Sequence, residues 1–204
     1  MTIATTAVSL TVNGRPVGPV EVPQDLMMLE FLQEYLNLTG TRYGCGQGVC
    51  RACTIIIDHP DGRSEAVASC ITGAAYLNGA RIRTIEGHAT RDDAGTVTAL
   101  SAIQQAYLEH FSFQCSYCTP GFVNGATVLV ERLAREPVNR ADVEQVVLDG
   151  MNRHICRCTG YVRYLTAVKD VILSTPGLTV DGPARPSGGQ GRGGQGRDSQ
   201  GDGP

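Results

Sequence analysis

Residues 43–54 read YGCGQGVCRACT, a stretch with three cysteines in nine residues, namely Cys45, Cys50 and Cys53. A fourth cysteine, Cys70, follows after a gap of 16 residues. Cysteines separated by four residues, by two residues and then by a long gap have the spacing of a plant-type [2Fe–2S] site. These four residues, called here the first cysteine group, are therefore predicted to ligate one such cluster.

The loop that carries three of these cysteines has the composition that an anionic cluster requires. Gly44, Gly46 and Gly48 allow the backbone to curl, so that amide N–H groups can point toward sulfur. The loop contains no carboxylate, and Arg42 and Arg51 place positive charge beside the cysteines. A purely structural role for the glycines would leave the three close cysteines unexplained.

The other four cysteines form two close pairs, Cys115-x2-Cys118 and Cys156-x-Cys158, called here the second cysteine group. Each pair directly precedes a predicted helix, so the positive ends of two helix dipoles would face one anionic site. Tetrahedral zinc also accepts four thiolates, although a one-residue spacing is unusual for structural zinc. Spacing alone thus favours a second [2Fe–2S] cluster over zinc without excluding zinc.

Disulfides are not expected among these eight cysteines. The N-terminus has no basic segment followed by an apolar stretch, which predicts a reducing compartment. Cys156 and Cys158 are also too close in sequence to bridge well. The expected location is the cytoplasm, or the periplasm if a partner that carries the signal exports the folded complex.

Composition narrows the possible partners. The 204 residues suffice for one ordinary domain or two small ones, and 42% of them are hydrophobic. A net charge of −3 argues against nucleic acid or an anionic membrane surface as a main partner. No apolar run approaches the roughly 18 residues of a spanning helix, so no direct membrane insertion is predicted.

Composition and periodicity predict four segments along the chain. These are a small β-rich α+β unit over residues 1–87, a polar linker over 88–97, a four-helix unit over 98–175 and a disordered Gly/Pro-rich tail over 176–204. From position 182 onward, 12 of 23 residues are Gly or Pro, which cannot bury enough surface to offset their ordering entropy.

Local signals place some elements within these segments. Asn13-Gly14 predicts the turn of a β-hairpin over residues 7–22. Thr119 and Thr159 are predicted caps of two helices. The first helix of the helical unit is predicted to bury one face, made of Leu100, Ile103, Tyr107 and Phe111.

Three motifs together resemble a known family. YGCGQGVCRACT at 43–54, QCSYCTPG at 114–121 and ICRCTGY at 155–161 are similar to the small iron–sulfur subunit of molybdenum hydroxylases. This is the family of xanthine dehydrogenase, aldehyde oxidase and carbon monoxide dehydrogenase. The resemblance covers about residues 6–175. It implies an N-terminal β-grasp ferredoxin-like domain followed by an all-α four-helix-bundle domain, each with one [2Fe–2S] cluster.

The resemblance also implies partners and a direction of electron flow. A large subunit would bind the molybdopterin cofactor, and Gln114 and Cys115 would reach toward the pterin. The second cysteine group would lie nearer the molybdenum, and the first nearer the surface. One departure stands out: Arg153-His154 occupies positions where the family usually has Gly-Asn. This larger, basic pair removes no ligand, but it is expected to alter the surroundings of the second cluster.

The expected function is that of an electron-transfer subunit in a heteromeric molybdenum-dependent oxidoreductase. Electrons would pass from the molybdopterin site through both clusters to a flavin, a cytochrome or another acceptor, and no catalytic residue is assigned in this chain. By family analogy alone, the overall reaction is expected to be aldehyde oxidation. The alternatives are the same role in an N-heterocycle or purine hydroxylase, and a free ferredoxin-like electron carrier.

Overall fold

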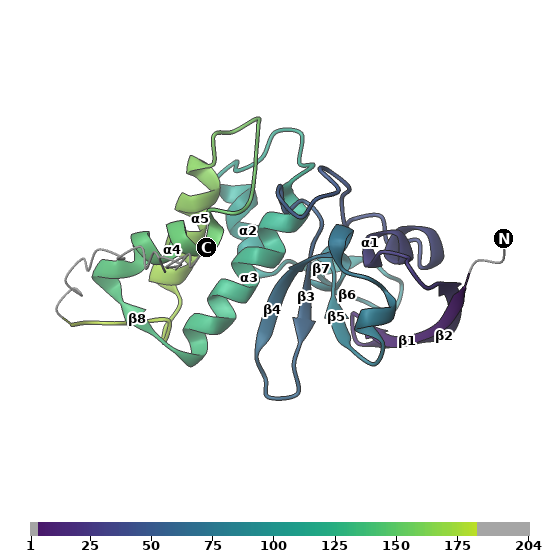
Figure 1. Ribbon diagram of the computed structural model, residues 1–204. Coiled ribbons are helices and arrows are strands. Elements are labelled where there is room, and N and C mark those ends of the chain that lie inside the picture. Colours follow the sequence, from purple (N-terminus) through teal and green to yellow (C-terminus); the bar gives the residue numbers. More distant parts are fainter. Residues whose placement is uncertain (1–3, 183–204) are drawn as a thin grey trace, which may run out of the picture.

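The computed structural model describes residues 4–182, in which a sheet-containing N-terminal half adjoins a helical C-terminal half (Figure 1). The predicted α+β class is thereby confirmed. The mixed sheet has the strand order β2-β1-β5-β3-β4, with β1 parallel to β5 and the other neighbours antiparallel. Its strands are β1 (Thr5–Val12), β2 (Arg15–Pro23), β3 (Thr54–Asp58), β4 (Ser64–Ala68) and β5 (Arg81–Arg83).

The predicted hairpin is present, because β1 and β2 pair around a turn in which Asn13 and Gly14 both have positive φ, 51° and 78°. Such a conformation suits Asn and Gly and matches the twist of the strands. A short α1 (Met28–Glu30) continues as a π-helical turn over Phe31–Tyr35. This turn buries Phe31 in the core of the sheet half.

The predicted linker, residues 88–97, contains structure of its own. Strand β6 (Thr90–Arg91) pairs with β7 (Val97–Ala99) in a small exposed hairpin. Three 3-10 turns, over Ser69–Ile71, Ala75–Leu77 and Ile85–Gly87, join the earlier elements. The chain therefore crosses between the halves through short ordered turns.

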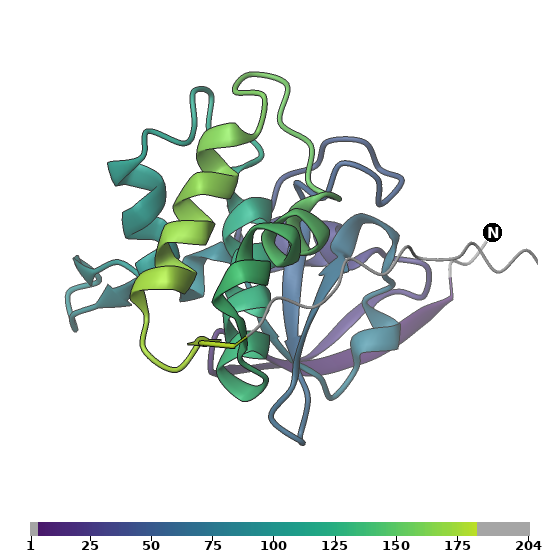
Figure 2. The ribbon, with the colours of Figure 1, turned by 90° about the vertical axis from the view of Figure 1, so that its left-hand side faces the viewer.

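The helical half consists of α2 (Ala102–Glu109), α3 (Thr119–Arg135), α4 (Val143–Met151) and α5 (Val162–Ser174). Helix α5 packs against α2 and α4 (Figure 2). Three rings fill the centre: Tyr164 stacks on Phe122 at 4.1 Å between centroids and meets the edge of Tyr107 at 4.8 Å. Within residues 4–182 no helix combines the length and the apolar character needed to cross a membrane.

Several sequence predictions about the helices need correction. The four-helix bundle is not confirmed, because the described residues form five α-helices, one of them in the sheet half. Phe111, predicted to face inward, is 74% exposed, because α2 ends before it and its φ is 48°. Thr119 lies inside α3 rather than capping it, and its hydroxyl pairs with that of Tyr164 at 2.7 Å. Helix α5 begins only after Tyr161, so Thr159 is not its N-cap.

The predicted start of the tail at residue 176 is too early. Leu178 is buried in the core of the helical half, and β9 (Thr179–Val180) pairs in parallel with β8 (Val138–Asn139). The buried side chain of Leu178 and the pairing of β9 with β8 hold this segment on the helical half. The rest of the predicted tail, residues 183–204, lies outside the described residues.

Helix α3 joins the two halves, since it lies against β3 and β4 (Figure 1). Asn124, buried in this helix, donates its side-chain N–H to the carbonyl of the first residue of β3 at 2.6 Å, and its side-chain oxygen accepts a hydrogen bond from the ring of His88 at 2.6 Å. Arg83 on β5 forms ion pairs with Asp58 on β3 and Glu131 on α3, both at 2.8 Å. These polar contacts fix the halves relative to each other.

Candidate metal centres

The first cysteine group lies in the loop before β3 and in the 3-10 turn after β4. The N–H groups of Gln47 and Cys50 point at Sγ of Cys45, each at 3.4 Å, and the N–H of Gly48 points at Sγ of Cys70 at 3.3 Å. These are the amide-to-sulfur contacts predicted from the glycine-rich sequence. The thiol of Cys45 also contacts that of Cys50, and the thiol of Cys53 contacts that of Cys70.

Two glycines make this loop possible. Gly46 and Gly48 have φ values of 67° and 69°, which L-residues with a side chain rarely adopt. A Cβ on Gly48 would lie 2.5 Å from the side chain of Ile71, and one on Gly46 would lie 2.4 Å from the hydroxyl of Tyr43. The positive φ therefore favours glycine at both positions, and the side chains of Tyr43 and Ile71 would have to shift to admit a Cβ.

The second cysteine group brings together the segment before α3 and the loop before α5. Sγ of Cys158 lies 3.5 Å from Sγ of Cys115, and both residues are exposed. Cys118 is the N-cap residue of α3, and its thiol contacts that of the buried Cys156. Gln114 is exposed next to Cys115. All eight thiols of the chain are free.

The eight sulfur atoms are thus arranged as four pairs, two pairs in each group. In residues 4–182, no three His, Cys, Asp or Glu side chains converge as a mononuclear metal site would require. A [2Fe–2S] cluster has a different requirement, because each of its two irons takes two protein ligands. The donor set and its pairing fit this cluster better than they fit zinc.

The protein environment changes the acidity of individual thiols. The N–H groups of Cys50 and Gln47 lower the pKa of Cys45 to about 6, so Cys45 can be a thiolate without a bound metal. Burial raises the pKa of Cys118 to about 12 and that of Cys70 to about 11. These two thiols need the positive charge of a bound metal to lose their protons.

The two cysteine groups are in direct backbone contact. The N–H of Ile155 donates to the carbonyl of Cys50 at 3.1 Å, so the loop before α5 touches the first cysteine loop. The hydroxyl of Tyr117 donates to the carbonyl of Tyr43 in a second bridge between the groups. In Figures 1 and 2 these loops gather at the same end of the molecule. This arrangement suits transfer of electrons between two nearby centres.

Two close packing contacts in this region cannot be predicted from the sequence. A Cβ on Gly121, in the first turn of α3, would lie 2.0 Å from the carbonyl oxygen of Arg51. His154 is 7% exposed and packs on Gly125, whose Cβ would lie 2.4 Å from the imidazole. A glycine in a helix indicates a close contact with another segment only once that segment is known. The role of these two glycines could not be read from spacing.

Comparison with known families agrees with this geometry. Residues 10–76 match the family described as 2Fe-2S iron-sulfur cluster binding domain, and residues 84–169 match the [2Fe-2S] binding domain. The nicotine 6-hydroxylase small subunit of Paenarthrobacter nicotinovorans is 36% identical over 163 residues, which cover 80% of this chain and 87% of that protein. The chain belongs to the small iron–sulfur subunits of the molybdenum hydroxylases. It is a subunit of a molybdenum-dependent oxidoreductase with a role in electron transfer.

Other members of the family show how this unit is used. The crystal structure of quinoline 2-oxidoreductase from Pseudomonas putida 86 contains a chain with 32% identity and a TM-score of 0.67, and the match covers 85% of this chain and 93% of that one. Aldehyde oxidase 1 of Oryctolagus cuniculus is 36% identical, but the match covers 78% of this chain and only 11% of the oxidase. The same iron–sulfur unit therefore occurs both as a separate subunit and within a longer chain.

Proposed function

We propose that the eight cysteines hold two [2Fe–2S] clusters and that the chain carries electrons, one at a time, from a molybdopterin-bearing large subunit to an external acceptor. The observation that carries this proposal is the convergence of the eight thiols in two groups of four, in adjoining loops whose N–H groups point at sulfur. When bound, the clusters supply one-electron redox chemistry. The chain's own residues set where the centres lie, how far apart they are and how much solvent reaches them.

On the basis of these contacts, we assign one pair of cysteines to each iron. In the first group, the pairs are Cys45 with Cys50 and Cys53 with Cys70. In the second group, the pairs are Cys115 with Cys158 and Cys118 with Cys156. We further propose that the sheet half is a β-grasp ferredoxin-like domain and that the helical half is the second cluster-binding domain.

Exposure of residues around each group supports a direction for the electrons. Gln114 and Cys115 are both exposed, which leaves them available to the pterin of a large subunit. Around the first group, Tyr43, Val49 and Ile71 are 57%, 58% and 57% exposed. These apolar side chains provide a surface on which a flavin subunit, a cytochrome or another acceptor would dock. The direction that we propose, from the second group to the first, is the one that the family resemblance implies.

The substrate of the large subunit belongs to one of two classes. Aldehyde oxidation is our first proposal, and aldehyde oxidase 1 shares 36% identity with this chain. Hydroxylation of an N-heterocycle is the second, favoured by the similarity over most of both chains to the nicotine 6-hydroxylase small subunit. Turnover of the purified complex with an aldehyde and with a pyridine or quinoline would separate the two. A cytoplasmic complex is the proposed setting, with periplasmic export on a partner's signal as the alternative.

Electron paramagnetic resonance of cysteine variants tests the assignment of the two sites. In the reduced complex, we expect two distinct [2Fe–2S] signals. Cys70→Ser should abolish one signal and Cys156→Ser the other, because each variant removes a ligand from a different group. Ser69→Ala, next to Cys70 but with its hydroxyl on a backbone carbonyl, should leave both signals in place. If either cysteine variant retained both signals, the assignment would be wrong.

A further inference from the structure

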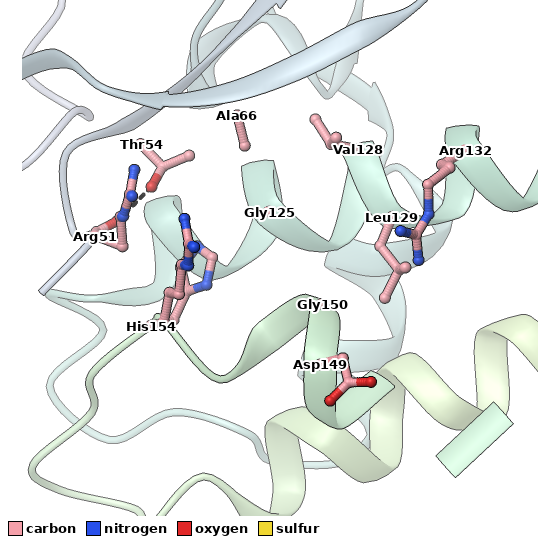
Figure 3. A pocket seen from close by; sticks show the side chains of 11 residues that line it. Arg51, Thr54, Ala66, Gly125, Val128, Leu129, Arg132, Asp149, Gly150 and His154 are labelled. Carbon is pink, nitrogen blue, oxygen red and sulfur yellow. Dashed lines mark hydrogen bonds between the residues drawn. The ribbon is translucent and has the colours of Figure 1, made fainter. Parts of the chain in front are cut away.

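A pocket between the two halves lies beside the cysteine loops but contains none of the proposed cluster ligands, and the proposed electron transfer gives it no role. Its volume is about 300 Å³, and it is lined by α3, the end of α4, the start of β3 and the segment before Ile155 (Figure 3). Ordinary small-molecule pockets begin at about this size, which is roughly ten times the volume a water occupies in the liquid. The pocket therefore has room for more than a single small ion.

The pocket concentrates positive charge in a chain whose net charge is −3. Arg51, Arg132 and Arg153 all line it, against a single carboxylate, Asp149. None of the three guanidinium groups forms an ion pair or a side-chain hydrogen bond with another residue of the described part of the chain. Asp149 accepts a hydrogen bond from Gln145 at 2.9 Å rather than pairing with an arginine. The arginines are thus free to bind an anion.

His154 gives independent support for a ligand in this pocket. The residue is 7% exposed, and neither ring nitrogen has a hydrogen-bond partner within residues 4–182. The carbonyls of Met151 and Gly121 lie near the ring, but neither completes a hydrogen bond. An imidazole carries at least one N–H donor whatever its protonation state. A buried donor without a partner is unfavourable, and an acceptor bound in the pocket would relieve this.

The side chains are arranged around a common space. In Figure 3, Arg51 and His154 lie close together on one side of the pocket, and Arg132 extends toward it from the other side of Gly125 and Val128. The absence of side chains at Gly125 and Gly150 leaves room for the lining side chains of His154 and Leu129. Cationic groups from both halves of the protein therefore surround one cavity.

From this geometry we infer that the pocket binds a small organic phosphate among the side chains of Arg51, Arg132, Arg153 and His154, which line it. Arginine matches phosphate oxygens with two parallel hydrogen bonds, and several arginines suit a dianion better than a monoanionic carboxylate. The volume beyond one phosphate accommodates the organic part. Because Arg51 follows Cys50 and His154 precedes Ile155, such a ligand would lie beside both cysteine loops.

Equilibrium dialysis of the intact holoenzyme complex with radiolabelled glycerol 3-phosphate tests this inference at constant ionic strength. We expect saturable binding of one ligand per chain, with displacement by inorganic phosphate but not by the same concentration of acetate. Arg132→Gln and Arg153→Gln should each weaken binding at least about tenfold, the effect of losing a charge-assisted contact. Arg135→Gln, one turn further along α3 and outside the pocket, should change binding less than about twofold.

Four results would overturn the inference. Absence of saturable binding would mean that the pocket takes no phosphate, and equal displacement by acetate would indicate a carboxylate site. Binding that Arg132→Gln and Arg153→Gln leave unchanged would belong to another subunit. Equal weakening by Arg135→Gln would show a general charge effect. Iron content and circular dichroism of each variant confirm that the protein is loaded and folded, so none of these results depends on the cluster assignment.

Discussion

Replacing Cys115 with serine is expected to stop turnover of the complex with every electron acceptor, artificial dyes included. Cys115 is exposed, and its Sγ lies 3.5 Å from that of Cys158, its proposed partner on one iron. A thiolate is the ligand form of cysteine, and a serine hydroxyl keeps its proton under conditions in which a thiol near metal loses it. The variant should therefore lose the centre through which all electrons leave the molybdenum site.

The measurement is steady-state turnover with the natural acceptor and with a dye, normalised to molybdenum content. Cys70→Ser is the matched comparison, because it removes a ligand of the first group and leaves the second intact. That variant should lose turnover with the natural acceptor but retain dye reduction from the second centre. Full dye activity in Cys115→Ser would show that the second centre does not lie on the main path.

Replacing Gly121 with alanine is expected to separate the two cysteine groups and to slow electron transfer between them. A Cβ at this position would lie 2.0 Å from the carbonyl oxygen of Arg51, which belongs to the backbone and cannot rotate away. Either α3 or the first cysteine loop must move. Overpacking of this kind typically destabilises a protein by about 1–3 kcal/mol. Since Cys118 is the N-cap residue of α3, the shift would reach the second cysteine group.

Stopped-flow reduction by substrate would resolve the effect on each centre. In Gly121→Ala, the second centre should be reduced at the normal rate, and the first should follow more slowly. Gly73→Ala is the control, because a Cβ there meets nothing within 4 Å. If both centres were reduced at normal rates and the unfolding temperature were unchanged, the contact between Gly121 and Arg51 would not determine the distance between the two cysteine groups.

The sequence was most informative where a local rule determines the structure. The Asn13-Gly14 turn, the alternation along β1 and β2, and the glycine-rich curl of the first cysteine loop all depend on neighbours in sequence. Such features need no knowledge of distant segments. The spacing of the cysteines is equally informative, because cysteines of one loop that bind the same cluster must lie within a few residues of one another. Both cysteine groups can therefore be predicted from the sequence.

The missed features depend on contacts between distant segments. Phe111 has the spacing of a buried helical residue, but α2 ends two residues earlier, where the chain turns toward Cys115. Leu178 falls within the predicted Gly/Pro-rich tail, yet it lies in the core of the helical half. The buried position of His154 on Gly125 likewise results from the packing of α3 against the loop before α5. Periodicity carries no information on such pairs.

Metal analysis of the chain purified with its natural partners, without exposure to air, tests the central claim most directly. Two [2Fe–2S] clusters require about four irons per chain, and a molybdenum hydroxylase complex adds about one molybdenum. We expect these two values together with no stoichiometric zinc. Zinc in place of iron would contradict the electron-transfer account, and iron without molybdenum would show that the chain works as a separate carrier.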